Sequence, residues 1–147
     1  MTVLLPAEDL VRHIGKAMPG SIAETLSDSI VIRPESLLET AKLLRDAPGL
    51  NFDYLNFITA VDYYQYFELV YRVTSLKHNH YAVFRVRTAG RDNQVVPSVT
   101  GVWQGADFQE REIFDLFGIS FEGHPDLRRI FLWEGFEGYP LRKDFLS

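Results

Sequence analysis

The densest group of residues that could do chemistry lies between positions 110 and 129. Its members are Glu110, Arg111, Glu112, Asp115, His124, Pro125, Arg128 and Arg129. Carboxylates beside arginines can form bidentate ion pairs that fix the register of two surfaces, and two converging carboxylates can act as acid and base. The two glutamates flank an arginine on a predicted helix, so they point in different directions. The pattern therefore favours ion pairing over acid–base catalysis.

We predict that these charges form a buried ionic network at a contact between subunits, joining Glu110, Arg111, Asp115, Arg128 and Arg129. Exposed salt bridges are the alternative, because Arg111 and Asp115 stand four residues apart and can pair along a helix for about 0.3 to 0.5 kcal/mol. Loss of Arg111 distinguishes the two. It should cost several kcal/mol of assembly energy if the network is buried, and almost nothing if it is exposed.

The histidines give weak signals for a metal site. His78-Asn79-His80 spells a nuclease motif but falls between two strand-like segments, and asparagine is favoured in hairpin turns, so we interpret it as a turn. His124 has no second histidine or cysteine nearby, so its ring is expected to hydrogen-bond and fix a turn. The alternative from a different class of function is a stand-alone metal-dependent enzyme that uses His78, His80 and His124.

No motif for nucleotide binding or serine hydrolysis is found, and we assign no catalytic, cofactor-binding or metal-binding residue. The net charge of −5 argues against a nucleic-acid partner, because phosphate binding needs a basic face. Cysteine is absent, which excludes disulfides and cysteine-ligated iron-sulfur clusters within this chain. No leader-like segment or apolar run of about 20 residues is found, so a soluble, cytoplasmic protein is expected.

The 147 residues, of which 46% are hydrophobic, fit one folded domain. Apolar spacing predicts helices over residues 6–18, from residue 34 to the break at residues 48–49, and over residues 106–117. Runs rich in β-branched and aromatic residues predict strands over residues 29–33, 51–62, 65–76 and 81–88. The expected fold is α+β, with a mainly antiparallel sheet covered by helices on one face and followed by a helix and an extended C-terminal segment.

Within these elements, alternate residues of the middle strand are apolar and should face the helices, namely Phe67, Leu69, Tyr71 and Val73. Asp107 is a candidate cap near the start of the last helix. Gly118 stands where a left-handed residue is expected to end that helix. We divide the chain into an α+β domain over residues 1–118 and an extended, partner-wrapping segment over residues 119–147.

The C-terminal segment is interrupted by glycine and proline but is too apolar and aromatic for a solvated terminus. Ordering its last 24 residues would cost about 25 to 50 kcal/mol, which requires about 1,000 to 2,000 Å² of buried surface. We hypothesise that it lies across another subunit, with two basic pairs meeting acidic groups there. The alternative is that it folds back on its own domain. The predicted interface comprises Glu110, Arg111, Glu112, Asp115, His124, Pro125, Arg128, Arg129, Arg142 and Lys143.

Three motifs in order resemble one family. They are the charged helix at residues 110–117, the segment Gly-His-Pro-Asp-Leu-Arg-Arg at residues 123–129, and the closing Pro-Leu-Arg-Lys-Asp-Phe at residues 140–145. Together they resemble the C-type, or thirty-kilodalton, subunit of the proton-pumping NADH:quinone oxidoreductase, respiratory complex I. The resemblance covers about residues 29 to 146, with departures at Phe108 and Tyr139, where the family often has Trp and His.

This resemblance implies a cofactor-free structural subunit of the hydrophilic arm, whose C-terminal segment embraces the D-type subunit that helps form the quinone site. Small iron-sulfur subunits of the B and I type would be further neighbours, and FMN and iron-sulfur clusters are expected in partner subunits. Membrane association would be indirect and peripheral, at the cytoplasmic face of a bacterial cell membrane or its organellar equivalent. A hydrogenase-, ferredoxin- or deazaflavin-linked relative of complex I is the nearer alternative.

Overall fold

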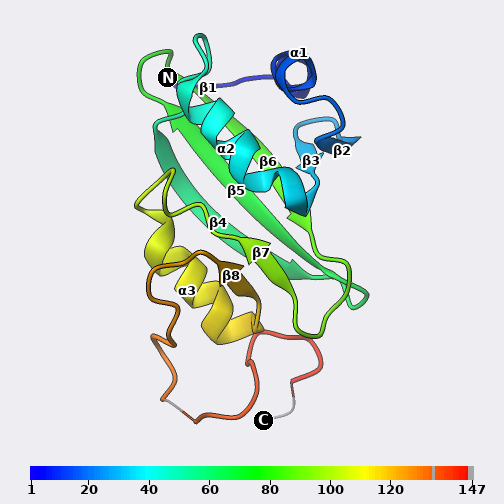
Figure 1. Cartoon of the computed structure of the whole chain (residues 1–147), viewed down its shortest axis with the longest axis vertical. Coiled ribbons are helices and arrows are strands. Elements are labelled where there is room, and N and C mark those ends of the chain that lie inside the picture. The colour runs from blue at the N-terminus through cyan, green and yellow to red at the C-terminus, as the bar shows by residue number, and fades with distance from the viewer. Residues whose placement is uncertain (134, 146–147) are drawn as a thin grey trace.

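The computed structural model describes residues 1–133 and 135–145. A twisted mixed sheet forms its centre (Figure 1). In spatial order its strands are β2 (Ile22–Thr25), β3 (Ile30–Ile32), β6 (His80–Arg87), β5 (Phe67–Ser75) and β4 (Tyr54–Asp62), and β1 (Val3–Leu4) pairs with β6. The pairings of β3 and of β1 with β6 are parallel, and the others are antiparallel. The α+β fold with a mostly antiparallel sheet is confirmed.

The predicted helices are present as α1 (Ala7–Ala17), α2 (Leu37–Asp46) and α3 (Ala106–Phe117). The second helix differs at its start, where residues Pro34–Ser36 form a 3-10 turn, η1, because the fixed φ of proline suits a tight turn as well as a first α-helical turn. Gly118 ends α3 with a φ of 79°, as expected, but Asp107 is not the cap. Gly105 holds that position, and among the described residues no side chain caps the helix.

The expected apolar face of β5 is fully buried, and within it the ring of Tyr71 stacks on Phe84 with centroids 4.8 Å apart. A second contact closes the core, since Trp103 Nε1 donates to the carbonyl oxygen of Phe52 at 2.8 Å. On the opposite face of β5, Glu68 is also buried, at 3% exposed. Burial of this charge is a feature that strand alternation does not predict.

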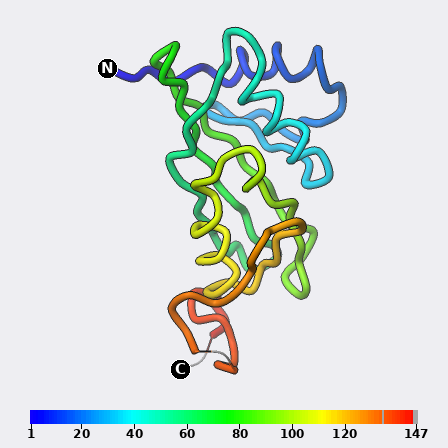
Figure 2. The backbone as a smooth tube through the Cα atoms, turned by 60° about the vertical axis from the view of Figure 1, so that its left-hand side comes forward, coloured from blue at the N-terminus to red at the C-terminus, as the bar shows by residue number. Residues whose placement is uncertain are grey.

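Two short strands that the sequence did not predict, β7 (Val95–Pro97) and β8 (Ser120–Glu122), pair in parallel and are connected through α3. Parallel pairing requires such a crossover connection. Ile119 and Phe121 are buried, so the core continues past residue 118 into β8. The division of the chain at residue 118 stays a prediction. The remaining tail forms a looped, separate end of the molecule (Figure 2).

Candidate subunit interface

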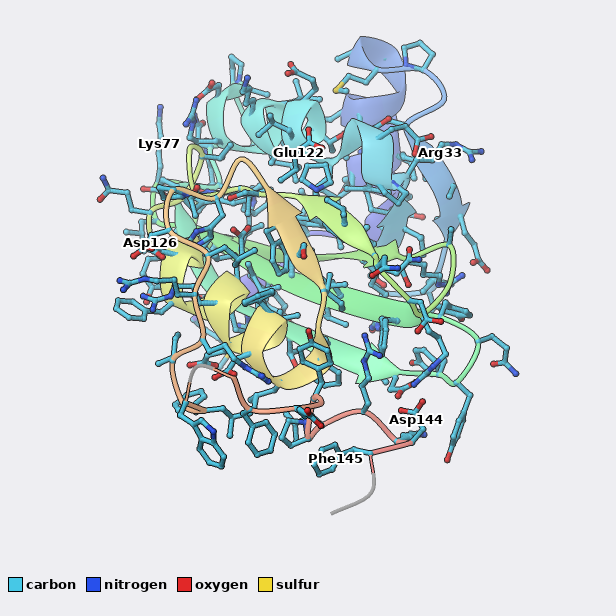
Figure 3. The ribbon with its side chains drawn as sticks, turned by 60° about the horizontal axis from the view of Figure 1, so that its bottom comes forward. Arg33, Lys77, Glu122, Asp126, Asp144 and Phe145 are labelled. Atoms are coloured by element: carbon cyan, nitrogen blue, oxygen red, sulfur yellow. The ribbon has the colours of Figure 1, made fainter. Side chains whose placement is uncertain are left out.

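The C-terminal tail, described over residues 123–133 and 135–145, follows α3 from its first turn to its last. At the first turn, His124 Nε2 lies 3.1 Å from the carbonyl oxygen of Asp107. At the last turn, the Leu141 N–H donates to the carbonyl oxygen of Leu116 at 3.0 Å. Figure 3 shows the same path, with Asp126 near the start of α3 and the end of the tail beyond its other end. The helix is therefore the support on which the tail is held.

Asp115 is the first anchor of the tail and is fully buried. Its Oδ2 accepts three consecutive backbone N–H groups, from Ile130 at 3.0 Å, Phe131 at 2.7 Å and Leu132 at 3.2 Å. The Arg129 guanidinium pairs with Oδ1. Burial alone would raise the pKa of Asp115, but Arg129 and these N–H groups hold it below its usual value. A stable negative charge on α3 thus organises the tail.

Arg129 extends this anchor into the loop that follows. Its Nη1 donates to the carbonyl oxygen of Phe136 at 2.6 Å, and its Nη2 donates to that of Gly138 at 2.8 Å. The guanidinium also lies over the Tyr139 ring, 5.1 Å from the centroid. Its donors are thus directed at groups of its own chain, and we infer that Arg129 shapes the loop.

Asp62 is the second anchor, and the sequence reasoning did not assign it. Its Oδ2 accepts from Arg91 Nη2 at 2.9 Å and from the Lys143 N–H at 2.8 Å, and its Oδ1 accepts from the Tyr64 N–H at 2.8 Å. The hydrogen bond from Arg91 is the main reason why the pKa of Asp62 lies well below its usual value. In the sequence, Asp62 stands only in the polar break that ends a predicted strand, and a polar break of this kind is equally typical of an ordinary turn.

The tail crosses the end of α3 at Gly118, where both the backbone conformation and the close packing of the tail require glycine. The residue has φ 79°, and a Cβ added there would lie 2.6 Å from a ring carbon of Tyr139 and 2.8 Å from Arg142 Nη2. Arg142 Nε donates to the carbonyl oxygen of Phe117 at 2.6 Å. Glycine both permits the left-handed turn and leaves room for the returning tail.

Glu110 faces the body of the protein and not the tail. It is fully buried, with Ser98 Oγ 2.7 Å from its Oε1 and the Val99 N–H donating to its Oε2 at 2.8 Å. Burial raises the pKa of Glu110 to about 7, against these two hydrogen bonds, which favour the ionised form. The Tyr71 hydroxyl is buried with no hydrogen-bond partner among the described residues, and burial and Glu110 raise its pKa as well.

Within the described residues, the charges predicted to form one network make separate contacts, and the network at a subunit contact stays a prediction. Asp115 pairs with Arg129 and not with Arg111, whose Nε instead donates to the carbonyl oxygen of Arg128 at 3.1 Å. Arg128 also pairs with Asp126 at 2.7 Å, in an exposed position. The other predicted interface residues are dispersed: Glu112, Pro125 and Lys143 are exposed. Their part in an interface with another subunit stays a prediction.

His124 fixes the turn at the start of the tail, as expected. Its side chain is fully buried, and its Nδ1 accepts the N–H of Asp126 at 2.9 Å. Because Nδ1 is an acceptor, the proton of a neutral ring lies on Nε2, which faces both the carbonyl oxygen and the Oδ1 of Asp107 at 3.1 Å. The ring is therefore held by groups on both sides.

His78 and His80 lie in and after the turn between β5 and β6, as expected. His78 Nε2 lies 2.9 Å from Asn51 Oδ1, and His80 Nε2 lies 3.2 Å from the carbonyl oxygen of Leu50. The three histidines considered for a metal site therefore have separate partners. The described part of the chain holds no group of three or more acidic, histidine or cysteine side chains suited to a metal ion.

Although its polar groups are bound within the chain, the tail exposes large apolar side chains. Phe131 is 61% exposed, Trp133 68% and Leu141 53%. The Trp133 ring contacts Phe136 edge to face, with centroids 4.8 Å apart, so its position is fixed against a second residue of the tail. A monomer gains nothing from exposing these side chains, so the arrangement suits binding of another protein.

Comparisons with known proteins agree on one family. The pattern of the "Respiratory-chain NADH dehydrogenase, 30 Kd subunit" family matches residues 30–147. A C-type subunit of the NADH-quinone oxidoreductase of Rhizobium meliloti (strain 1021) is 48% identical over 122 residues, 80% of this chain and 65% of that protein. The C-type subunit of the same enzyme from Roseiflexus sp. (strain RS-1) is 42% identical over 142 residues, 92% of this chain and 81% of that protein.

A solved structure shares the fold. A chain in the structure of the membrane-bound sulfane sulfur reductase, an archaeal respiratory membrane complex, superposes with a TM-score of 0.75 at 25% identity. The match covers 94% of this chain and 84% of that one. Against the two rhizobial relatives, from Rhizobium meliloti and Rhizobium etli, this chain spans 65% and 64% of the relative's length.

Proposed function

This chain belongs to the family of the 30 Kd subunit of respiratory-chain NADH dehydrogenases, and we propose that it is the structural, C-type subunit of a proton-translocating NADH:quinone oxidoreductase. In this role it binds no cofactor and holds the quinone-site and iron-sulfur subunits together during electron transfer to quinone. Catalysis belongs to the assembly. FMN and iron-sulfur clusters are carried by partner chains.

The observation that carries this proposal is the anchored but apolar tail. Two buried aspartates, Asp115 and Asp62, hold it in a defined path. Phe131, Trp133 and Leu141 nevertheless remain exposed. A segment ordered in advance loses less conformational entropy when it binds, so it favours a stable contact. We assign the partner in this contact to the D-type quinone-site subunit, with iron-sulfur subunits of the B and I type as further neighbours.

Membrane association is indirect in this proposal. Among the described residues, no helix has the length and apolar character needed to cross a lipid bilayer. The chain would reach the cytoplasmic face of the cell membrane, or the equivalent organellar surface, through its partner subunits. The predicted interface residues Glu112, Pro125 and Lys143 are exposed and accessible to such a partner.

The test is affinity purification of the tagged chain from native membranes, followed by identification of the co-purifying subunits. Wild-type chain should recover cluster-bearing and quinone-site subunits and NADH:quinone activity. A Phe131→Ser/Trp133→Ser chain should lose them by about tenfold or more, because interface aromatics carry much of the binding energy. Leu76→Ser is the matched control: Leu76 is 69% exposed, but it lies in the turn between β5 and β6.

Two results would overturn the proposal: recovery of the wild-type chain as a lone monomer, or equal recovery of subunits with the tail variant and the control. A second candidate function is the equivalent subunit of a hydrogenase-, ferredoxin- or deazaflavin-linked relative of complex I. It is favoured by the fold shared with a chain of a respiratory complex that reduces sulfane sulfur. Purification of an assembly without NADH oxidation would select it.

A further inference from the structure

A second surface, remote from the tail, is suited to binding. In Figure 1, α2, α3 and the β7–β8 pair lie on the viewer's side of the sheet, and no described helix crosses its other side. The register places Phe57, Arg72 and Val83 side by side on that far side. Tyr54 and Tyr81 share it because they flank Thr74, two residues from Arg72. We call these five residues the open face.

The open face is apolar except for one charge. Tyr54 is 53% exposed and Phe57 38%. The guanidinium of Arg72 lies over the Tyr81 ring, 4.0 Å from its centroid. Clustered exposed aromatics on a sheet face are typical of protein contacts, since the other side of a sheet is normally packed against a further layer.

The Nε atom of Arg72 is the feature of the open face that indicates a partner. This atom is buried and has no hydrogen-bond partner among the described residues. The direct cross-strand neighbours of Arg72, Phe57 and Val83, have no side-chain oxygen. A buried charged donor without an acceptor is unfavourable, so a partner that brings an oxygen would gain from binding here.

Two other arginines on the same side of the sheet show the contrast. Arg85 Nη1 and Arg87 Nε each lie 2.8 Å from a carboxylate oxygen of Glu68, whose side chain is only 4% exposed. The described residues thus supply a carboxylate for these two arginines and none for Arg72. The difference indicates that the acceptor for Arg72 comes from outside the chain.

We propose that the open face is a second protein interface, and that its occupant is an amphipathic helix of a neighbouring subunit. The helix lays its apolar side on Tyr54 and Phe57 and presents an Asp or Glu carboxylate to Arg72. A helix is the fitting element because this is the face of a sheet and not its edge, and α2 covers the opposite face in the same way. The inference rests on the proposed function, since the neighbour is a chain of the same assembly.

The experiment measures the retention of tagged variants in the assembly purified from native membranes. Arg72→Glu should lower the amount of chain retained per complex by about tenfold or more, because it places two carboxylates in contact. Arg72→Lys, which keeps the charge, should retain most of it. Lys77→Glu is the matched control, since it reverses a charge in the exposed turn after β5 and should behave as wild type.

A second measurement tests the same interface without depending on whether the Arg72→Glu variant folds. A photo-crosslinking amino acid at position 57, in the otherwise wild-type assembly, should link to a helical peptide of another subunit that contains an Asp or Glu. Wild-type retention of Arg72→Glu together with no crosslink from position 57 would overturn this inference. If the tail variant were missing from the purified assembly while the Arg72 variants were retained, the proposed interface at the open face would be wrong and the proposed function would stand. If wild-type chain recovered no subunits, the proposed function would fail.

Discussion

Helix α3 buries one carboxylate in each half, and the pKa values of the two groups are shifted in opposite directions. Glu110 and Asp115 are both fully buried. Burial raises the pKa of Glu110 to about 7, whereas Arg129 and a row of backbone N–H groups outweigh burial and hold the pKa of Asp115 below its usual value. The number and charge of the donors therefore decide the direction of the shift, and the carboxylate with the lowered pKa is the one that holds the tail.

Replacing Asp115 by Ala should have the largest effect on the isolated chain. It leaves the Arg129 charge and three N–H groups without their acceptor, so unfolding free energy should fall by about 3 to 5 kcal/mol. Urea denaturation measures this loss, and limited proteolysis should show faster cleavage of the tail. Asp126→Ala removes an exposed carboxylate as a control. Equal stability of the two variants would contradict the role of Asp115 as the anchor.

The second-largest expected effect is on the pH dependence of stability, to which Glu110 and Asp115 should contribute in opposite directions. The folded state raises the Glu110 pKa from 4.5 to about 7, so it binds this proton more tightly than the unfolded state does. Its stabilising effect is full below pH 4.5 and is lost as the pH rises through about 7, a change of about 3 kcal/mol. Asp115, with a lowered pKa, acts in the opposite sense and loses its contribution as the pH falls.

Glu110→Gln should remove the Glu110 part of this dependence, because the amide can accept from Val99 and donate to Ser98 without ionising. Thermal denaturation from pH 4.5 to 8.5 should then show that the stability of the variant relative to wild type increases as the pH rises. Glu112→Gln, at an exposed position of the same helix, is the matched control. Parallel curves for Glu110→Gln and wild type would show that Glu110 titrates normally.

Replacing Arg111, which lies between the two carboxylates, should have the smallest effect. Arg111 donates to one backbone carbonyl and lies over Phe108, which is 60% exposed. Arg111→Ala should therefore cost the isolated chain about 1 kcal/mol or less in a urea titration. Arg129→Ala is the comparison and should be far more damaging. A large loss for Arg111→Ala would mean that a buried ionic network does reach this position.

Elements defined by local patterns could be predicted from the sequence. The α3 bounds at Ala106 and Phe117 follow from apolar spacing and from Gly118, and both are confirmed. Strands β7 and β8 could not be found in this way, because each is three residues long and its pairing depends on a partner across α3. Short parallel pairs have no turn signal between them.

The candidate site shows the same division. The charged residues of α3 were identified and Arg129 was placed in one network with Asp115, but the pairing within that network was not predicted, because spacing along a helix makes Arg111 an equally good partner. The actual partner, Arg129, reaches Asp115 by the returning path of the tail, which sequence spacing does not encode. Asp62 looked like part of a turn, since its contact with Lys143 joins residues far apart in the chain.

The sequence by itself determined the layered α+β fold, the family and the apolar, interrupted character of the tail, because periodicity, glycine positions and motifs are local properties of a chain. Only the tertiary structure decided which charges pair, that Glu110 and Asp115 have opposite pKa shifts, and that Arg72 Nε is buried without an acceptor among the described residues. These properties depend on burial and on donors from distant segments, which exist only once the chain has folded.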